Sequence, residues 1–158
     1  MFVLVDGYNL LRFAEKLEGW ESITDIGLCR MVSQYLRIIG ATGQVVFDGI
    51  GPPDKQPFEN YSNMEVLFSG RNVDADSIIL TKISLDSAPK GLVVVSSDRE
   101  LQAAARKRKA VPVKSQVFFT QMADELGKKR KPPQEPPQKR TGISDGETDE
   151  WLKTFGFK

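Results

Sequence analysis

Short, wholly apolar runs constrain the fold of this chain more than any other feature of its sequence. Residues 2–5, 45–47 and 92–95 read Phe-Val-Leu-Val, Val-Val-Phe and Leu-Val-Val-Val. Runs this short, without polar alternation, are typical of strands buried on both faces of a parallel sheet. We expect strands at residues 2–5, 44–47, 64–68 and 92–95, and a short edge strand at 111–113, where a proline is tolerated.

Segments with helical periodicity separate the expected strands. Between residues 26 and 39 the apolar residues recur at helical spacing, and Gly40 just past the end is a stop signal. Three further helices are expected: from Asp74 to about Asp86, from a capping box at Ser97 to about Lys109, and over residues 116–126. This alternation predicts an α/β domain with three layers around a parallel, Rossmann-like sheet.

Composition divides the 158 residues into three parts. Residues 1–127 have the composition of one globular domain. Residues 128–147 are rich in proline and lysine, and 128–140 carry six basic residues against one acidic residue, so we expect a disordered, basic linker. In residues 148–158, Trp151, Leu152 and Phe155 share a helical face. This favours a peptide that docks on a protein partner or on the domain itself over a tail without a specific role.

The absence of histidine excludes whole classes of active site. Nucleophilic systems that use histidine as base, and nearly all zinc sites, need this residue. The single Cys29 cannot form an internal disulfide. The N-terminus does not look like a signal peptide, and no run is long enough to cross a membrane. We expect a cytoplasmic protein without a membrane partner, whose chemistry uses carboxylates, hydroxyls, amides, lysine or arginine.

Aspartates stand where the expected strands end. Asp6 and Asp48 directly follow the first two strands, and Asp98 lies just past the strand at 92–95. Because the carboxyl ends of parallel strands meet at one sheet edge, these side chains should lie close together. Asp76, in the first turn of the helix after the third strand, and Asn9 belong to the same edge. Each acid alone also suits a turn or a helix N-terminus, so their joint position is what indicates a site.

A cluster of carboxylates needs a compensating cation. Two like charges about 4 Å apart repel by about 4 kcal/mol at an effective dielectric constant near 20. Oxygen ligands select hard cations such as Mg²⁺ or Mn²⁺, and these ions support phosphodiester hydrolysis without histidine. We expect a metal-dependent nuclease. Its candidate catalytic residues are Asp6, Asn9, Asp48, Asp76 and Asp98, of which the four aspartates are the candidate metal ligands.

Basic and aromatic side chains near this edge are candidates for substrate contacts. We expect Arg12, Lys55 and Arg71 on loops at the active edge, where they could steer a phosphate backbone. Tyr8, Phe58 and Tyr61 could stack on unpaired bases, which favours single-stranded or looped RNA; for Phe58 and Tyr61, packing within the loop is an equal alternative. The candidate substrate-binding residues are Tyr8, Arg12, Lys55, Arg71, Ser97 and Arg99.

At these residues the sequence resembles the YacP-like branch of the NYN domain family, within the PIN-like nuclease superfamily. The resemblance covers about residues 1–126 and rests on four blocks in order: residues 5–11 (Val-Asp-Gly-Tyr-Asn-Leu-Leu), 45–48, 66–79 and 94–99. It implies a PIN-like fold, a Mg²⁺ or Mn²⁺ site, and an endoribonuclease. By matching position, it implies that Asp6, Asp48, Asp76 and Asp98 bind the metal and that Asn9 orients water or substrate.

Three other functions fit parts of the pattern. A non-catalytic RNA- or ribosome-binding module with the same fold would lack one or more of the four acids, and all are present. A phosphatase that uses Asp6 as a covalent nucleophile usually needs a second acid where Tyr8 stands. A 5′-nuclease acting on DNA commonly has more acids and a helical arch, for which this chain has no room. Dependence of RNA cleavage on a partner such as the ribosome stays open.

Overall fold

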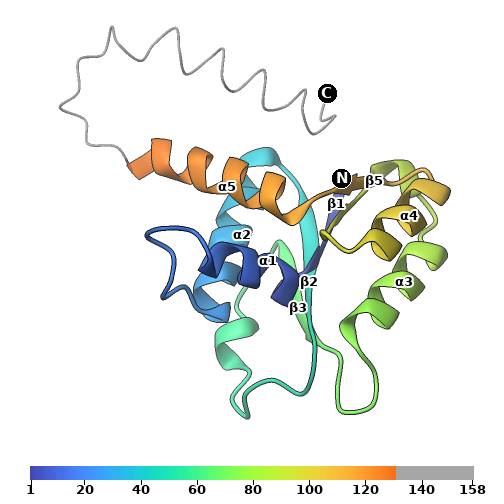
Figure 1. Ribbon diagram of the computed structural model, residues 1–158, viewed down its shortest axis with the longest axis horizontal. Coiled ribbons are helices and arrows are strands. Elements are labelled where there is room, and N and C mark those ends of the chain that lie inside the picture. The colour runs from blue at the N-terminus through green and yellow to red at the C-terminus, as the bar shows by residue number, and fades with distance from the viewer. Residues whose placement is uncertain (131–158) are drawn as a thin grey trace, which may run out of the picture.

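The computed structural model describes residues 1–130, which form a five-stranded parallel sheet with helices on both faces (Figure 1). The strand order is β3-β2-β1-β4-β5, and every pairing is parallel. The predicted α/β class and three-layer parallel sheet are therefore confirmed. The elements are β1 (Phe2–Asp6), α1 (Gly7–Glu15), α2 (Asp25–Ile39), β2 (Thr42–Phe47), η1 (Gln56–Phe58), β3 (Met64–Phe68), α3 (Ala75–Leu85), η2 (Pro89–Gly91), β4 (Leu92–Val95), α4 (Arg99–Lys107), β5 (Val111–Val113) and α5 (Ser115–Arg130).

The first strand lies in the middle of the sheet, and later strands are added on both of its sides. From β1 the chain moves outward to β2 and β3, and then returns to the other side of β1 for β4 and β5. The switch point lies between the carboxyl ends of β1 and β4, and open α/β sheets bind their ligands at such a point. The topology thus places Asp6, the last residue of β1, at the centre of the expected site.

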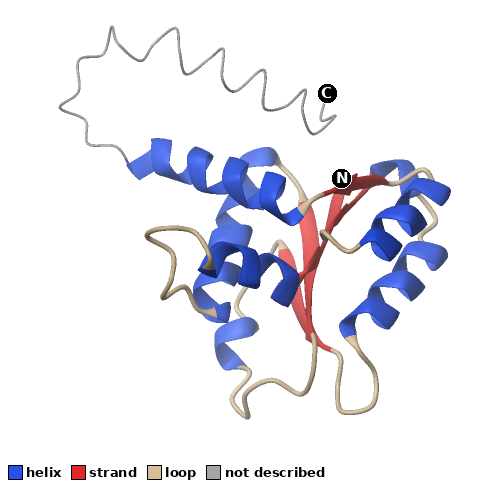
Figure 2. Ribbon diagram, viewed as in Figure 1, coloured by secondary structure: helices blue, strands red, loops and turns tan. Residues whose placement is uncertain are grey.

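Alternate side chains of the strands enter two hydrophobic cores. Val3, Val5 and Val95 belong to the core covered by α1, α2 and α5, whereas Leu4 and Val94 belong to the core covered by α3 and α4. Figure 2 shows these two helical layers on opposite sides of the sheet. Because both faces are covered, β1 and β4 carry no polar alternation in their sequences, which is the pattern of a buried parallel strand.

Local capping signals fix two helices where the sequence predicts them. The Thr24 hydroxyl accepts a hydrogen bond from the Gly27 N–H at 3.0 Å, and α2 ends at Ile39, just before Gly40, whose φ of 70° is left-handed. The Asp74 carboxylate accepts from the Ser77 N–H at 2.8 Å and begins α3. These contacts satisfy backbone groups that a helix end leaves without partners.

The structure differs from the sequence-based expectations in three local details. Arg12 was expected on a loop, but residues 7–15 form α1, which begins at Gly7 directly after β1. The predicted capping box at Ser97 does not form, because Asp98 caps α4 by accepting from the N–H groups of Glu100 and Leu101. Helix α5 continues to Arg130, so the first three residues of the predicted linker are helical.

The rest of the predicted linker and the predicted docking tail at 148–158 lie outside the described residues. The proposed boundaries between the three parts of the chain therefore stay predictions. Within residues 1–130, no helix combines the length and the apolar character needed to cross a membrane.

Candidate active site

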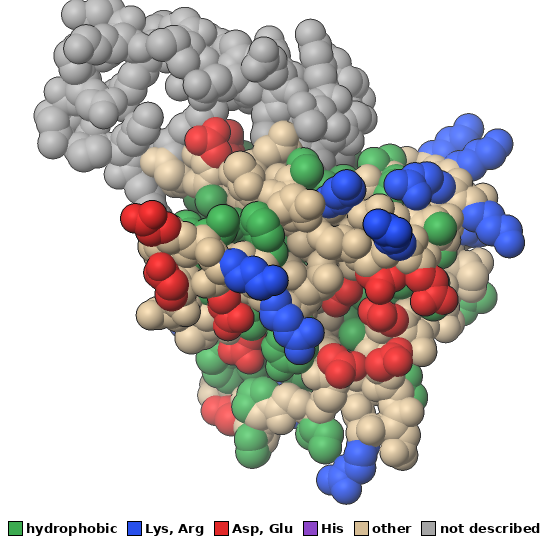
Figure 3. Space-filling model, in the orientation of Figure 1, with side chains coloured by type: hydrophobic (Ala, Val, Ile, Leu, Met, Phe, Trp, Pro, Cys, Tyr) green, Lys and Arg blue, Asp and Glu red, His purple; other side chains and the backbone are tan. Residues whose placement is uncertain are grey.

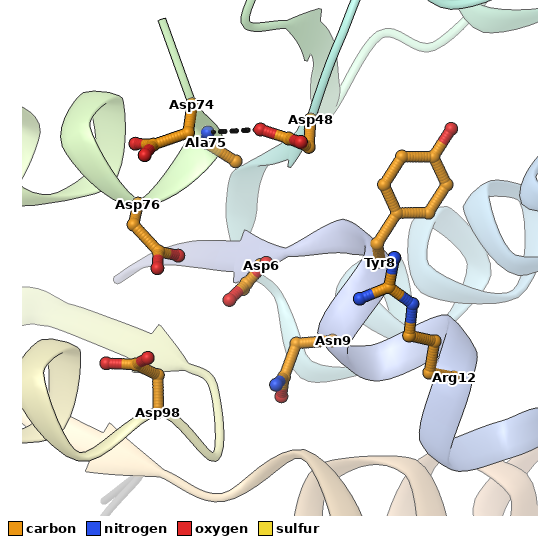
Figure 4. A pocket seen from close by; sticks show the side chains of 9 residues that line it. All are labelled: Asp6, Tyr8, Asn9, Arg12, Asp48, Asp74, Ala75, Asp76 and Asp98. Atoms are coloured by element: carbon orange, nitrogen blue, oxygen red, sulfur yellow. Dashed lines mark hydrogen bonds between the residues drawn. The ribbon is translucent and has the colours of Figure 1, made fainter.

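An acidic hollow of about 310 Å³ opens at the carboxyl end of the sheet. Figure 4 shows its carboxylates arranged around one space, with Asp6 at the centre. In the space-filling view, acidic side chains gather on this face beside α3 and α4 (Figure 3). We call this cavity the acidic hollow. It is lined by Asp6, Tyr8, Asn9, Arg12, Asp48, Asp74, Ala75, Asp76 and Asp98.

Separate chain segments deliver the acids to this hollow. Asp6 ends β1, Asp48 follows β2, Asp76 lies in the first turn of α3, and Asp98 precedes α4. The parallel register brings these points together, since β1 pairs with both β2 and β4. All four predicted metal-binding aspartates therefore line one cavity, and Asp74, predicted as a helix cap, lines it as well.

Hydrogen bonds hold three of the carboxylates in fixed orientations. Asp6 Oδ2 accepts from the Ser96 hydroxyl at 2.9 Å. Asp48 Oδ1 accepts from the Ala75 N–H at 2.9 Å, drawn as a dashed line in Figure 4. Asp98 uses Oδ1 for its capping contacts with α4. For Asp48 and Asp98 these contacts occupy Oδ1, which leaves Oδ2 as a potential ligand atom.

The acids of the hollow oppose one another's ionisation. The pKa of Asp6 is raised from 3.8 to about 6, mainly by burial and to a smaller extent by the charges of Asp76 and Asp98, while the hydrogen bond from Ser96 partly offsets the rise. Burial, followed by the charge of Asp98, also raises the pKa of the half-buried Asp76. Both effects disfavour the charged carboxylate, and a nearby cation would reverse them.

The donor set fits a hard divalent cation held by few protein ligands. Within residues 1–130, no three His, Cys, Asp or Glu side chains are placed to hold a metal ion together. Mg²⁺ is commonly bound by one or two carboxylates, with water and substrate phosphate as the other ligands. The separated carboxylates of the hollow suit that mode, whereas a cage of three or more protein ligands does not fit.

The wall opposite these acids carries hydrogen-bond donors. Tyr8, Asn9 and Arg12 all come from α1 and lie together on one side of the hollow in Figure 4. The Arg12 guanidinium carbon lies 5.9 Å from the centre of the Tyr8 ring, and the Tyr8 ring contacts Phe47 with centroids 4.9 Å apart. Arg12 was expected on a loop, and its position on a helix gives this wall a regular scaffold.

The structure does not bring the other candidate substrate contacts into the hollow. The Lys55 ammonium donates to the Pro52 carbonyl and lies 5.2 Å from the ring centre of Phe68 at the end of β3, so it packs against its own loop and β3. Arg71 and Arg99 are exposed and do not line the cavity. Phe58 is buried in the core and Tyr61 packs against it, so for both residues loop packing is the observed state.

Sequence reasoning missed Ser96, Gln102, Ser115 and Gln116, which support the residues of the site through hydrogen bonds. Ser96 is fully buried and bonds Asp6, and the Gln102 amide donates to the Ser96 carbonyl at 3.0 Å. Ser97 does not line the hollow; its side chain donates to Gln116 Oε1 at 2.8 Å and accepts from the Ser115 N–H at 3.2 Å. Ser115 follows the fifth strand, so the rule that sites gather at strand ends could have identified it.

Comparisons with known proteins identify the family and the fold. The family model described as the YacP-like NYN domain matches residues 3–155, which extends beyond the region in which the sequence resemblance was seen. The crystal structure of Rae1 (YacP) from Bacillus subtilis is similar, with a TM-score of 0.66 and 20% identity over 99% of this chain and 92% of that chain. A tryptophan-to-leucine mutant of the same protein gives a TM-score of 0.59 and 22% identity over 98% and 91%. At these identities the structural likeness shows a shared fold. No curated protein matches the sequence.

Proposed function

The chain belongs to the YacP-like NYN domain family, a family of PIN-like nucleases, and on this premise we propose that it is a metal-dependent endoribonuclease. The proposed reaction is hydrolysis of RNA phosphodiester bonds in the acidic hollow. The proposed cofactor is Mg²⁺ or Mn²⁺, and the proposed metal ligands are drawn from Asp6, Asp48, Asp76 and Asp98.

The observation that carries this proposal is the convergence of four carboxylates from separate segments on one hollow. Burial, and to a smaller extent mutual repulsion, raises the pKa values of Asp6 and Asp76, so the arrangement disfavours ionisation in the free protein. A fold gains no stability from such a cluster, and a function that uses a divalent cation explains it.

The two walls of the hollow have separate roles in this proposal. A divalent cation bound at the carboxylates would polarise the scissile phosphate and stabilise the charge that develops during hydrolysis. The carboxylates of Asp48 and Asp98 keep their orientation because backbone N–H groups hold one oxygen of each. Arg12, on the opposite wall, binds the phosphate backbone and offsets the negative charge of the hollow.

The proposed substrate is single-stranded or looped RNA. Tyr8 is half-exposed, lines the hollow and rests on Phe47, so the exposed part of its ring can contact an unpaired base beside the scissile phosphate. A base inside a duplex cannot reach such a ring without being unstacked. The substrate class thus follows from the position of this aromatic side chain relative to the acids.

An RNA cleavage assay tests the proposal. Mixed-sequence single-stranded RNA is incubated with the wild type, Asp6→Asn, Asp98→Asn and the control Asp124→Asn, in Mn²⁺, Mg²⁺ or EDTA. Asp124 is exposed on α5, away from the hollow, so its variant controls for the loss of one carboxylate. We expect cleavage by the wild type and Asp124→Asn in either metal, and none in EDTA or by the other two variants, once circular dichroism has verified their folding.

A second candidate function is a non-catalytic RNA- or ribosome-binding module. The observation in its favour is that no three acids among residues 1–130 are placed to hold one metal ion. This function predicts that RNA binds without cleavage and that Mn²⁺ leaves the melting temperature unchanged. The endoribonuclease predicts a rise in the melting temperature of the wild type with Mn²⁺, because an ion that binds only the folded state stabilises it.

A further inference from the structure

The carbonyl oxygen of the Asn9 side chain is held by two donors. Asn9 Oδ1 accepts a hydrogen bond from the Ser97 backbone N–H at 2.9 Å and from the Ser115 hydroxyl at 2.5 Å. These donors come from the turn before α4 and from the first residue of α5, which are distant in sequence from α1. Three segments therefore meet at one carboxamide on the wall of the hollow.

The chemistry of the donors fixes the orientation of this carboxamide. A backbone N–H can only donate, so the Asn9 atom that faces Ser97 is the oxygen and not the nitrogen. The Ser115 hydroxyl then has to donate as well, since Oδ1 has no proton. A carbonyl oxygen has two lone pairs, and here both are occupied. Oδ1 is consequently not available as a metal ligand.

Ser97 and Ser115 are themselves locked in place. The Ser97 hydroxyl accepts from the Ser115 N–H at 3.2 Å and donates to Gln116 Oε1 at 2.8 Å. Ser115 is fully buried, so water does not compete for its hydroxyl. The support behind Asn9 is thus a closed set of hydrogen bonds that joins the start of α5 to the turn before α4.

The remaining polar atom of Asn9 is a free donor at the hollow. No acceptor within residues 1–130 takes a hydrogen bond from Nδ2, and Asn9 lines the cavity between Asp98 and Arg12 (Figure 4). An anionic phosphate entering a hollow lined by aspartates needs donors on the opposite wall. A neutral amide supplies one without attracting the carboxylates as strongly as a second cation would.

We infer that Ser115 is a positioning residue, which holds Asn9 Oδ1 so that Nδ2 donates a hydrogen bond to a non-bridging oxygen of the RNA phosphate. This inference rests on the proposed function, and it assigns Asn9 to the substrate and not to the metal. The serine is not expected to touch RNA, because its hydroxyl is buried behind Asn9.

A double-mutant cycle tests the inference. Metal-dependent RNA cleavage is measured for the wild type, Asn9→Ala, Ser115→Ala, the pair of substitutions together, and Ser115→Thr, which keeps a hydroxyl. We expect kcat/KM to fall by about 10²–10³-fold in Asn9→Ala, as when one preorganised donor is removed. Ser115→Ala lowers it by about 10–100-fold, as for other residues that orient a ligand, and Ser115→Thr restores most of the activity.

The combined variant separates positioning from a structural role. If Ser115 acts through Asn9, the Ser115→Ala substitution causes no further loss in the Asn9→Ala background. An equal fold-loss in both backgrounds, or wild-type activity of Ser115→Ala, overturns the inference. Failure of the proposed function is recognised separately, because then the wild type itself does not cleave RNA.

The Asn9 side-chain amide gives a second readout that needs neither RNA nor metal. Its NH₂ signals in a ¹H–¹⁵N spectrum are assigned by their absence in Asn9→Asp. We expect a well-resolved, rigid pair in the wild type, and motional averaging in Ser115→Ala at unchanged backbone shifts outside the site. A pair that is equally rigid in both proteins contradicts the positioning role, whatever the cleavage assay gives.

Discussion

Asp6 shows at the level of one residue how the site acts against the stability of the fold. Its side chain is only 7% exposed, and burial raises its pKa to about 6. At neutral pH this side chain is mostly ionised, although its buried position disfavours the charged form. The Ser96 hydroxyl offsets part of this cost, since its own acceptance of the Asp98 N–H at 3.1 Å directs its proton to Asp6.

This pKa predicts a dependence of stability on pH in the metal-free protein. The folded state holds the Asp6 proton up to about pH 6, whereas the unfolded chain releases it near pH 4. Between these values the folded state binds more protons, so the free energy of unfolding decreases as the pH rises. The contribution of Asp6 is full below about pH 4 and lost above about pH 6, a difference on the order of 2–3 kcal/mol.

The Asp6→Asn substitution removes the decrease in the free energy of unfolding that accompanies ionisation of Asp6. In EDTA at pH 7.5, we expect Asp6→Asn to have a higher free energy of unfolding than the wild type and a flatter dependence on pH between 4 and 7. Urea denaturation at several pH values measures both, and Asp124→Asn is the control with the wild-type profile. If Asp6→Asn keeps the slope of the wild type, the raised pKa has been assigned to the wrong group.

At the level of elements, the helices with ordinary start signals were predictable and α1 was not. Thr24 and Asp74 cap their helices through their side chains. Asp6 precedes α1 without a capping hydrogen bond from its side chain, and the first turn of α1 has no acidic residue. The Asp6–Gly7 pair therefore looks like a turn in the sequence. The Asp6 carboxylate instead accepts a hydrogen bond from the Ser96 hydroxyl.

The turn after α4 contains a residue in an unfavourable conformation. Lys109 has a φ of 65° and is the one non-glycine residue with a positive φ among residues 1–130. We expect Lys109→Gly to raise the free energy of unfolding by about 1 kcal/mol, because glycine adopts this conformation without steric cost. Lys109→Ala controls for the lost charge and should not stabilise. Denaturant titration measures both, and equal stabilisation by alanine would point to charge as the cause.

Close contact between β1 and β2 depends on Gly43. A Cβ atom at this position would lie 2.4 Å from the Val3 carbonyl oxygen and 3.1 Å from Leu36 Cδ1. We expect Gly43→Ala to lower the free energy of unfolding by about 1–3 kcal/mol, since the strands must shift. Gly91→Ala is the matched control, because no atom lies within 4 Å of its added Cβ. Equal effects of the two substitutions would contradict tight packing at Gly43.

At the level of the whole molecule, one rule predicts the fold and the position of the acids in the hollow. The same rule does not predict the opposite wall, which α1 forms. Parallel strands that end in aspartates predict both the sheet and the convergence of Asp6, Asp48 and Asp98. The position of Arg12 depends on α1, which the sequence does not signal. Lys55 and Arg71 were expected at the site because their loops follow strand ends; in the structure Lys55 contacts Pro52 and Phe68 instead, and Arg71 is exposed.

The acids and Arg12 lie on opposite walls of the hollow, and this arrangement predicts that Arg12 and Arg71 differ in their contribution to RNA binding. Arg12 lines the hollow, and Arg71 is exposed outside it. We expect Arg12→Gln to weaken RNA binding and to reduce the slope of log K against log salt by about 1, as the loss of one phosphate contact does. Arg71→Gln should leave both nearly unchanged. Binding titrations at several salt concentrations in EDTA measure this, and identical effects of the two variants would exclude a specific role for the wall formed by α1.

The chemistry of the RNA ends tests the central claim most directly. RNA cut in Mn²⁺ by the wild type, Asp76→Asn and Asp124→Asn is analysed for its terminal groups. Hydrolysis by water, supported by a cation at the acids, predicts products without 2′,3′-cyclic phosphates, formed by the wild type and Asp124→Asn and lost in EDTA and in Asp76→Asn. Cyclic phosphate ends, or cleavage that persists in EDTA or in Asp76→Asn, would contradict a metal-dependent active site in the acidic hollow.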